Sequence, residues 1–223
     1  MLKTTKGKLD MRNRSFLTCF TGVDGSGKTT HAKSLIKSLN EMGYSCKYVW
    51  GASRPILSYA FFAFTRLLGY WKQTRKNAYT DPLEHTPRNL AKKFAILWRF
   101  FLFLDFQIKA TFKIRLPLAL GKVVVCDRYF YDLLMELERS TVSSDRFTVM
   151  LSKTLPQPVI TFLLDVPKTL ANQRRGFSCE ELGAKRRAFL QIGKFFGFVI
   201  VDSSKDFFNN QKRIRALTLA RVS

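Results

Sequence analysis

Short apolar runs alternate with longer amphipathic stretches along most of this chain. Most of the short runs lack strict alternation of apolar and polar residues, which is typical of strands in a parallel sheet that is covered on both faces. We therefore predict five strands, over residues 15–22, 44–50, 122–127, 158–165 and 197–202.

The stretches between these runs have helical periodicity. Apolar residues recur at three- and four-residue spacing from Ala32 to Met42, and Gly43 stands where a glycine commonly ends a helix. Residues 86–116 are apolar and almost free of helix breakers until Pro117, which predicts one or two helices there. Two more helices are predicted around residues 189–196 and 214–217. This alternation of strand and helix indicates a doubly wound α/β domain.

The length and composition favour a single domain. A chain of 223 residues with 46% apolar residues can bury one core and is not disordered. We find neither repeats nor a linker, so residues 15–223 are predicted to form one domain. Residues 1–14 hold a small cluster of basic side chains and are predicted to be a basic N-terminal arm.

The two most apolar stretches are residues 56–71 and 94–106. Each is shorter than the roughly 20 residues that a membrane-spanning helix needs, and each carries a charge. We interpret them as buried helices, with a membrane-surface role as the alternative. The cysteines lie far apart and include no CxxC pair, which argues against zinc and disulfides and predicts a reduced, cytoplasmic compartment.

The net charge of +22 bears on which partners the protein binds. Such an excess suggests a polyanionic partner, namely nucleic acid, an anionic lipid surface or several phosphates at once. An equally good interpretation is a cationic surface that keeps a phenylalanine-rich protein in solution. The basic residues are spread along the chain, so the charge alone does not choose between these interpretations.

A glycine-rich loop follows the first predicted strand and precedes a helix. Residues 22–29 match the pattern G-x-x-x-x-G-K-[ST] at every fixed position. In such a loop the backbone N–H groups surround the β-phosphate, Lys28 bridges the β- and γ-phosphates, and Thr29 offers its hydroxyl group to Mg²⁺. The sequence therefore predicts a site for ATP and magnesium. The predicted ATP-binding residues here are Gly22, Val23, Asp24, Gly25, Ser26, Gly27, Lys28, Thr29 and Thr30.

A second motif lies at the end of the third predicted strand, where Asp127 is followed directly by Arg128. An acidic residue at the carboxyl end of a strand beside the phosphate loop can hold the magnesium shell, so Thr29 and Asp127 are the predicted metal site. Arg128 can bind a second phosphate with its planar guanidinium group. A plain Asp–Arg surface pair would give the same sequence.

A third motif follows the fourth predicted strand. Pro167 is predicted to open a helix that reaches Arg174 and Arg175. Arginines on a hinged segment can close over a triphosphate and neutralise charge in the transition state. The alternative is a solvated basic helix face.

The order and spacing of "FTGVDGSGKTT", "CDRY" and "LLDVP", with the arginine doublet after it, resemble the thymidylate kinase family of nucleoside monophosphate kinases, including its archaeal type. The resemblance covers about residues 15–220. It implies the P-loop NTPase fold, with a five-stranded parallel sheet and helices on both faces. It also implies transfer of the γ-phosphoryl group of ATP to a nucleoside monophosphate, with dTMP as the first expected acceptor, and a homodimer paired through the apolar helices.

The resemblance assigns roles to residues at matching positions. Asp24 helps to place the acceptor and magnesium, Arg128 and Arg54 hold the acceptor phosphate, and Ser204 lies near the adenine. Residues 51–85 form the acceptor side, and residues 167–180 form a lid that carries Arg174 and Arg175. The implied catalytic residues are Lys28, Asp24, Arg128, Arg174 and Arg175.

The expected base-binding helix departs from the family pattern. Phe103 and Phe106 can stack on a base, but the arginine that usually reads thymine is missing, and Asp105 stands nearby. Three alternatives therefore stay open. In the first, the acceptor is another nucleotide or a lipid-like molecule. In the second, the protein binds nucleic acid or membrane and uses ATP as a switch. In the third, it is an inactive relative that only binds ATP.

Overall fold

The computed structural model describes residues 15–51, 57, 60, 63–64, 95–139, 145–167 and 179–222. Its five strands form one parallel sheet in the order β2-β3-β1-β4-β5. Each strand lies inside one of the predicted runs, so the predicted α/β class with a five-stranded parallel sheet is confirmed. The strands are β1 (Leu17–Thr21), β2 (Cys46–Trp50), β3 (Val123–Asp127), β4 (Ile160–Asp165) and β5 (Val199–Asp202).

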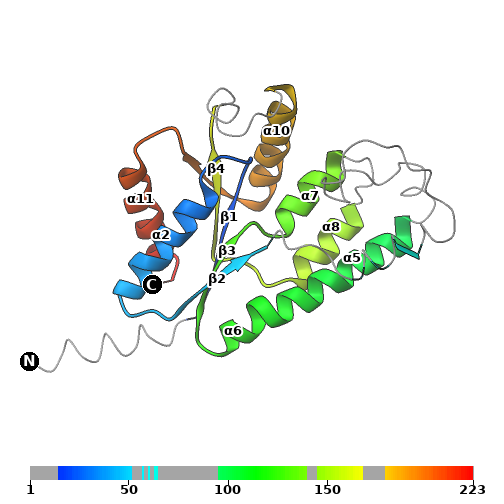
Figure 1. Cartoon of the computed structure of the whole chain (residues 1–223), viewed down its shortest axis with the longest axis horizontal. Coiled ribbons are helices and arrows are strands. Elements are labelled where there is room, and N and C mark those ends of the chain that lie inside the picture. Colours follow the sequence, from blue (N-terminus) through cyan, green and yellow to red (C-terminus); the bar gives the residue numbers. More distant parts are fainter. Residues whose placement is uncertain are drawn as a thin grey trace, which may run out of the picture.

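Helices cover both faces of this sheet (Figure 1). One face packs against α2 and α11, through a core that includes Leu35 and Ile214. The other face packs against the remaining helices, through a core that includes Leu102, Leu134 and Phe189. The helices are α2 (Lys28–Glu41), α5 (Ala95–Ala110), the π-helix η1 (Thr111–Arg115), α6 (Leu116–Ala119), α7 (Phe130–Arg139), α8 (Asp145–Thr154), α10 (Cys179–Phe196) and α11 (Phe207–Ala220).

This two-sided burial explains the apolar strands. Along β1, Leu17 and Cys19 belong to one core and Phe20 belongs to the other. Successive side chains of a strand point to opposite faces, so a strand covered on both faces has no exposed positions to fill with polar residues. All five residues of β1 and of β3 are buried.

The long helical segment differs from the prediction at its end. Pro117 does not stop it, because α5, η1 and α6 follow one another directly and Pro117 lies in the first turn of α6, where the missing N–H group costs least. The predicted burial is wrong in part. Leu102 is buried, but Ile96 is 84% exposed and Phe100 is exposed as well. Among the described residues, no helix is both long and apolar enough to cross a membrane.

Several predicted segments fall outside the described residues. They are the basic arm over 1–14, all but a few positions of the acceptor side over 51–85, and residues 168–178 of the lid. Arg54, Arg174 and Arg175 belong to these segments, and their predicted roles stay predictions.

Candidate active site

The phosphate loop connects β1 to α2 at the carboxyl edge of the sheet. Gly22, Gly25 and Gly27 have φ angles of 137°, 83° and 87°, in the region that side chains other than glycine rarely adopt. Gly22 also lies against β4, because a Cβ atom added to it would be 2.5 Å from the Leu164 carbonyl oxygen. The glycines of the motif are therefore required by the conformation of the loop and by its contact with the neighbouring strand.

Lys28 is the first residue of α2, and its side chain lies inside the loop. Its Nζ donates to the carbonyl oxygens of Gly22 and Val23, at 2.9 and 2.7 Å. Burial, together with the positive charge of Arg128, lowers the pKa of Lys28 to about 8, although three neighbouring carboxylates oppose this effect. The ammonium group is thus held at the position where the loop would surround a phosphate.

The predicted metal ligands come together. The Thr29 hydroxyl group donates to Oδ2 of Asp127, because β3 lies next to β1 and ends beside the loop. The hydroxyl group of Tyr48 donates to the same oxygen at 2.7 Å. Burial and the Asp127 carboxylate raise the pKa of Tyr48 to about 12, so Tyr48 keeps its proton.

This arrangement fits Mg²⁺. The other carboxylate oxygen of Asp127, Oδ1, is buried and has no hydrogen-bond partner, which is an unusual state for a buried polar atom. The part of the chain that the structure describes contains no cluster of three or more His, Cys, Asp or Glu residues for a metal. Mg²⁺ does not need one, since it commonly binds through one or two protein oxygens, substrate phosphates and water.

Asp24 and Arg128 form an ion pair across the site. A second carboxylate, Asp132, lies 3.9 Å from the Arg128 guanidinium group, and Lys28 lies 4.0 Å from Asp24. Burial raises the pKa of Asp24, but the positive charges of Arg128, Lys28 and Lys185 outweigh it and hold this pKa below its usual value. Asp24 is therefore ionised, and two cations from different elements converge beside the loop.

The backbone of Arg128 is held in a strained conformation. Its φ angle of 68° makes it the only residue other than glycine with a positive φ among those that the structure describes. Its N–H group donates to Phe20, and Gly51 approaches so closely that an added Cβ atom would be 2.0 Å from the Arg128 carbonyl oxygen. Strain of this kind persists only where the surroundings enforce it, and it gathers at functional sites.

Sequence reasoning missed several residues of this site. Tyr48 lies inside the second predicted strand and carried no signal of its own. Asp132 is buried and accepts from the Thr21 hydroxyl group at 3.0 Å and from the Tyr129 N–H group at 3.1 Å. It lies in the first turn of α7, four residues after Arg128. That four-residue spacing was the available signal. Lys185 on α10 is buried, and its charge acts on Asp24.

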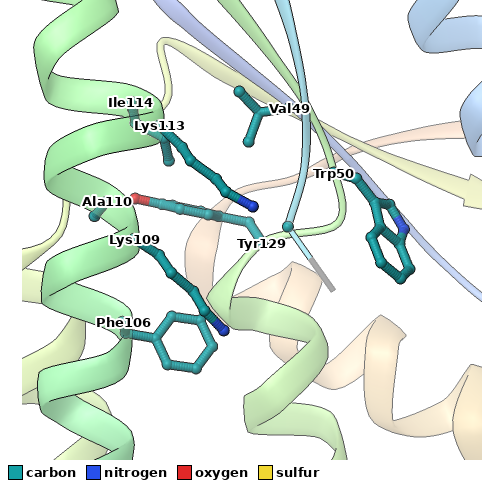
Figure 2. Close-up of a pocket in the computed structure, with 9 residues that line it drawn as sticks. Val49, Trp50, Phe106, Lys109, Ala110, Lys113, Ile114 and Tyr129 are labelled. Atoms are coloured by element: carbon teal, nitrogen blue, oxygen red, sulfur yellow. The ribbon is translucent and has the colours of Figure 1, made fainter. Parts of the chain in front are cut away.

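An open pocket lies beside Gly51 and Tyr129, which are neighbours of Arg128 in space and in sequence (Figure 2). Phe106 lines this pocket and Phe103 does not, and their contact with an acceptor base stays a prediction. Lys109 of α5 and Lys113 of η1 extend into the pocket, and the Lys109 ammonium group is 5.9 Å from the centre of the Phe106 ring. The lining residues are Val49, Trp50, Gly51, Phe106, Lys109, Ala110, Lys113, Ile114 and Tyr129.

The other side of the site lies at the ends of β4 and β5. Ser204 follows β5, and its hydroxyl group donates to Oδ1 of Asp202 at 2.5 Å. Ser203 donates to the carbonyl oxygen of Asp165 at 3.1 Å, which ties this turn to β4. Asp165 itself pairs with Arg186 through two contacts of 2.6 and 2.7 Å. The turn with Ser204 therefore lies at the same sheet edge as the phosphate loop, and its role beside an adenine stays a prediction.

Asp105 is used within the protein. It is buried, and its Oδ1 accepts from the backbone N–H group of Leu57 at 2.9 Å. It therefore tethers the chain near residue 57 to α5.

Comparison with known proteins supports the resemblance seen in the motifs. No family model matches the chain. It is 26% identical to a probable thymidylate kinase of Sulfurisphaera tokodaii over 193 residues, which are 82% of this chain and 85% of that protein. A probable thymidylate kinase of Pyrococcus abyssi is 29% identical over 155 residues, 69% of this chain and 66% of that protein. One of Methanothermobacter thermautotrophicus is 26% identical over 204 residues, 89% of this chain and 92% of that protein. The chain is thus similar, over most of its length, to proteins named probable thymidylate kinase, which confirms the suspected resemblance to that family.

Proposed function

We propose that this protein transfers the γ-phosphoryl group of ATP to a nucleoside monophosphate, with dTMP as the preferred acceptor. The proposal rests mainly on one observation. The phosphate loop, through Thr29 and Asp24, contacts Asp127 and Arg128 at one edge of the sheet. The names of the relatives support the same reaction. They give no support to a lipid-like acceptor or to an ATP-switched binding module, so nucleotides are the acceptors to test first.

The residues suit an in-line transfer. An oxygen of the acceptor monophosphate attacks the γ-phosphorus, the bond from that phosphorus to the β-phosphate oxygen breaks, and ADP leaves. The attacking oxygen is already anionic, so no general base is needed. The main obstacle is repulsion between two polyanions, which positioned cations reduce. Lys28 would hold the β- and γ-phosphates and Arg128 the acceptor phosphate, while Arg174 and Arg175 would close over the γ-phosphate from the lid.

Thr29 and Asp127 would hold Mg²⁺, which when bound supplies neutralisation of the charge on the β- and γ-phosphates. Thr29 offers its hydroxyl oxygen, and Asp127 offers the buried Oδ1 that lacks a hydrogen-bond partner. Tyr48 would fix the orientation of the Asp127 carboxylate by donating to its other oxygen. Orientation of this kind by a neighbouring hydrogen bond is common at metal sites.

The pocket beside Arg128 would take the acceptor base. Phe106 offers an apolar ring, and Lys109 and Lys113 offer ammonium donors. Thymine and uracil present carbonyl oxygens that can accept from such donors, whereas cytosine presents an amino group at the corresponding edge. These donors favour a keto pyrimidine although the usual arginine is missing. Arg54 and Phe103 are further proposed contacts of the acceptor.

A transfer assay with Mg-ATP and a panel of acceptors tests the function. We expect diphosphate from dTMP and dUMP, at rates about tenfold or more above the rate with dCMP, because a hydrogen bond to a charged donor contributes roughly 1.5–3 kcal/mol. Lys109→Met should reduce the preference for dTMP over dCMP, since it removes a donor and keeps the apolar stem. If ATP binds but no nucleoside monophosphate is phosphorylated, the proposed function is wrong.

The close contact between Gly51 and Arg128 gives an independent test of the acceptor site. Gly51→Ala should displace the Arg128 backbone, cost about 1–3 kcal/mol of folding free energy, and raise the KM for the acceptor more than the KM for ATP. Gly121→Ala is the control, because it adds a Cβ atom at a φ angle of 74° with nothing within 4 Å. The control should lose folding stability only because alanine is unfavourable at this positive φ angle, and its KM for the acceptor should equal that of the wild type. Equal acceptor KM values in both variants and the wild type would contradict the role given to this contact.

A further inference from the structure

Asp132 is a buried carboxylate beside a site that would bind two polyanions. It lies in the first turn of α7 and is 8% exposed. A fixed negative charge repels phosphate groups, so its presence here opposes substrate binding and needs another explanation. Burial raises the pKa of Asp132, but the positive charges of Arg128 and Lys28 and two hydrogen bonds oppose this effect. The two neighbouring cations thus favour the carboxylate form.

One oxygen of this carboxylate, Oδ2, joins the end of β1 to the turn after β3. It accepts from the Thr21 hydroxyl group at 3.0 Å and from the Tyr129 N–H group at 3.1 Å. Thr21 is the last residue of β1 and directly precedes the phosphate loop. The Tyr129 N–H group belongs to the peptide that follows Arg128, whose φ angle is 68°. Asp132 therefore holds the strained turn at a fixed distance from the phosphate loop.

The other oxygen, Oδ1, lies near the Arg128 side chain. It is buried, it has no hydrogen-bond partner among the described residues, and it is 3.9 Å from Nη1 of Arg128. Asp24 contacts Nη2 of the same guanidinium group. Burial lowers the pKa of Arg128, but the carboxylates of Asp132 and Asp24 outweigh burial and raise it. The guanidinium group thus lies between two carboxylates, one on the phosphate loop and one on α7.

We propose that Asp132 is a positioning residue that keeps Arg128 in place for the acceptor phosphate. The inference rests on the proposed function, because it needs Arg128 to bind that phosphate. An incoming phosphate competes with Asp24 for the guanidinium group, since both are anions. Asp132 is buried and lies near the other terminal nitrogen, so it can hold Arg128 while the acceptor binds. Its hydrogen bond to Thr21 ties this arginine to the loop that would hold ATP, and the relative placement of two substrates strongly affects the rate.

Asp132→Asn separates positioning from charge. The variant keeps the shape of the side chain and removes a negative charge beside a phosphate site, so charge alone predicts tighter binding of the acceptor. Positioning predicts the opposite. We expect kcat/KM for the best acceptor to fall by about tenfold or more, and the KM for ATP to stay within about twofold of the wild type. Initial rates with each substrate varied in turn give both constants. An unchanged or raised kcat/KM for the acceptor overturns the proposal.

An Arg128→Ala background shows whether Asp132 acts through Arg128. Residues that act as one unit give non-additive losses, so Asp132→Asn should cost less than about twofold in kcat/KM once Arg128 is replaced. A carboxylate that only stabilises α7 would cost the same in both backgrounds, and that result overturns the proposal. Asp206→Asn is the matched control, because Asp206 also accepts a backbone N–H group at the start of a helix, at 2.9 Å, but on α11. It should keep kcat/KM for the acceptor within about twofold of the wild type.

Thr21 provides a second test, which serves if Asp132→Asn does not fold. Thr21→Val keeps the side-chain shape and removes the donor to Asp132, so kcat/KM for the acceptor should fall by about fivefold. Thr21→Ser keeps the hydroxyl group and should stay within about twofold of the wild type. Equal values in these two variants overturn the proposal. A wild type that phosphorylates no nucleoside monophosphate overturns the proposed function and this inference with it, whereas an active wild type with any of the contrary results overturns this inference alone.

Discussion

Lys28→Ala should lower ATP-dependent phosphoryl transfer by about a thousandfold, because the ammonium group is the positioned cation of the phosphate loop. In the structure Lys28 is buried and already bonded to two carbonyl oxygens of the loop. It is therefore pre-positioned at the place where the phosphates would lie, and little reorganisation would accompany their binding. The measurement is the rate of diphosphate formation at saturating ATP and acceptor.

Lys33→Ala is the matched control for this variant. Lys33 lies on the same helix with its side chain exposed, so its loss removes the same charge and a similar stem without touching the loop. Far-ultraviolet circular dichroism and thermal unfolding should show that both variants keep the fold. Transfer by Lys28→Ala within a fewfold of the wild-type rate would rule out the assignment of residues 22–29 as the phosphate-binding loop of this enzyme.

Arg128→Ala should raise the KM for the acceptor by roughly ten- to a hundredfold, because a hydrogen bond to a charged group contributes about 1.5–3 kcal/mol. The KM for ATP should change much less, since Arg128→Ala removes the partner of Asp24 but leaves the contacts of Lys28 inside the loop. Initial rates measured with each substrate varied in turn separate the two constants. Arg128→Lys should recover only part of the loss, because an ammonium group lacks the planar fork that binds two phosphate oxygens.

The Arg186–Asp165 pair supplies the control for this experiment. It is a two-contact ion pair at the same sheet edge, but it joins α10 to β4, whereas Arg128 joins the turn after β3 to the phosphate loop. Arg186→Ala should leave the acceptor KM within about twofold of the wild type, since a partly exposed pair of this kind contributes little beyond local stability. A similar rise in acceptor KM for both variants would assign the effect to general loss of positive charge.

The backbone elements of the sheet could be predicted well from sequence. A strand buried on both faces needs apolar residues at every position, which leaves a continuous run that is easy to find in the sequence. The phosphate loop was equally visible, because its three glycines and Lys28 are required locally by its conformation and charge. Helix ends were less certain, as Pro117 shows. The preference of proline for the first turn of a helix cannot be distinguished by sequence alone from its role as a helix breaker.

Contacts between distant segments could not be predicted in the same way. Tyr48 donates to Asp127 across neighbouring strands, and Gly51 restrains Arg128 from a different loop. Neither contact leaves a local pattern, because it depends on the order of strands in the sheet. The position of the pocket lysines could not be predicted either. In the sequence, Lys109 and Lys113 do not differ from other basic residues on a helix, and only the packing of this helical segment beside β2 places them next to Tyr129.

The sequence by itself determined the α/β class, the positions of the strands and the phosphate loop, since each follows from local burial or local backbone conformation. The tertiary structure alone decided which charges meet: Thr29 with Asp127, and Asp24 with Arg128. It also decided that the apolar segment 94–106 is only partly buried. Apolar composition shows that a helix prefers to leave water, but only the packing of the whole chain decides which of its faces does so.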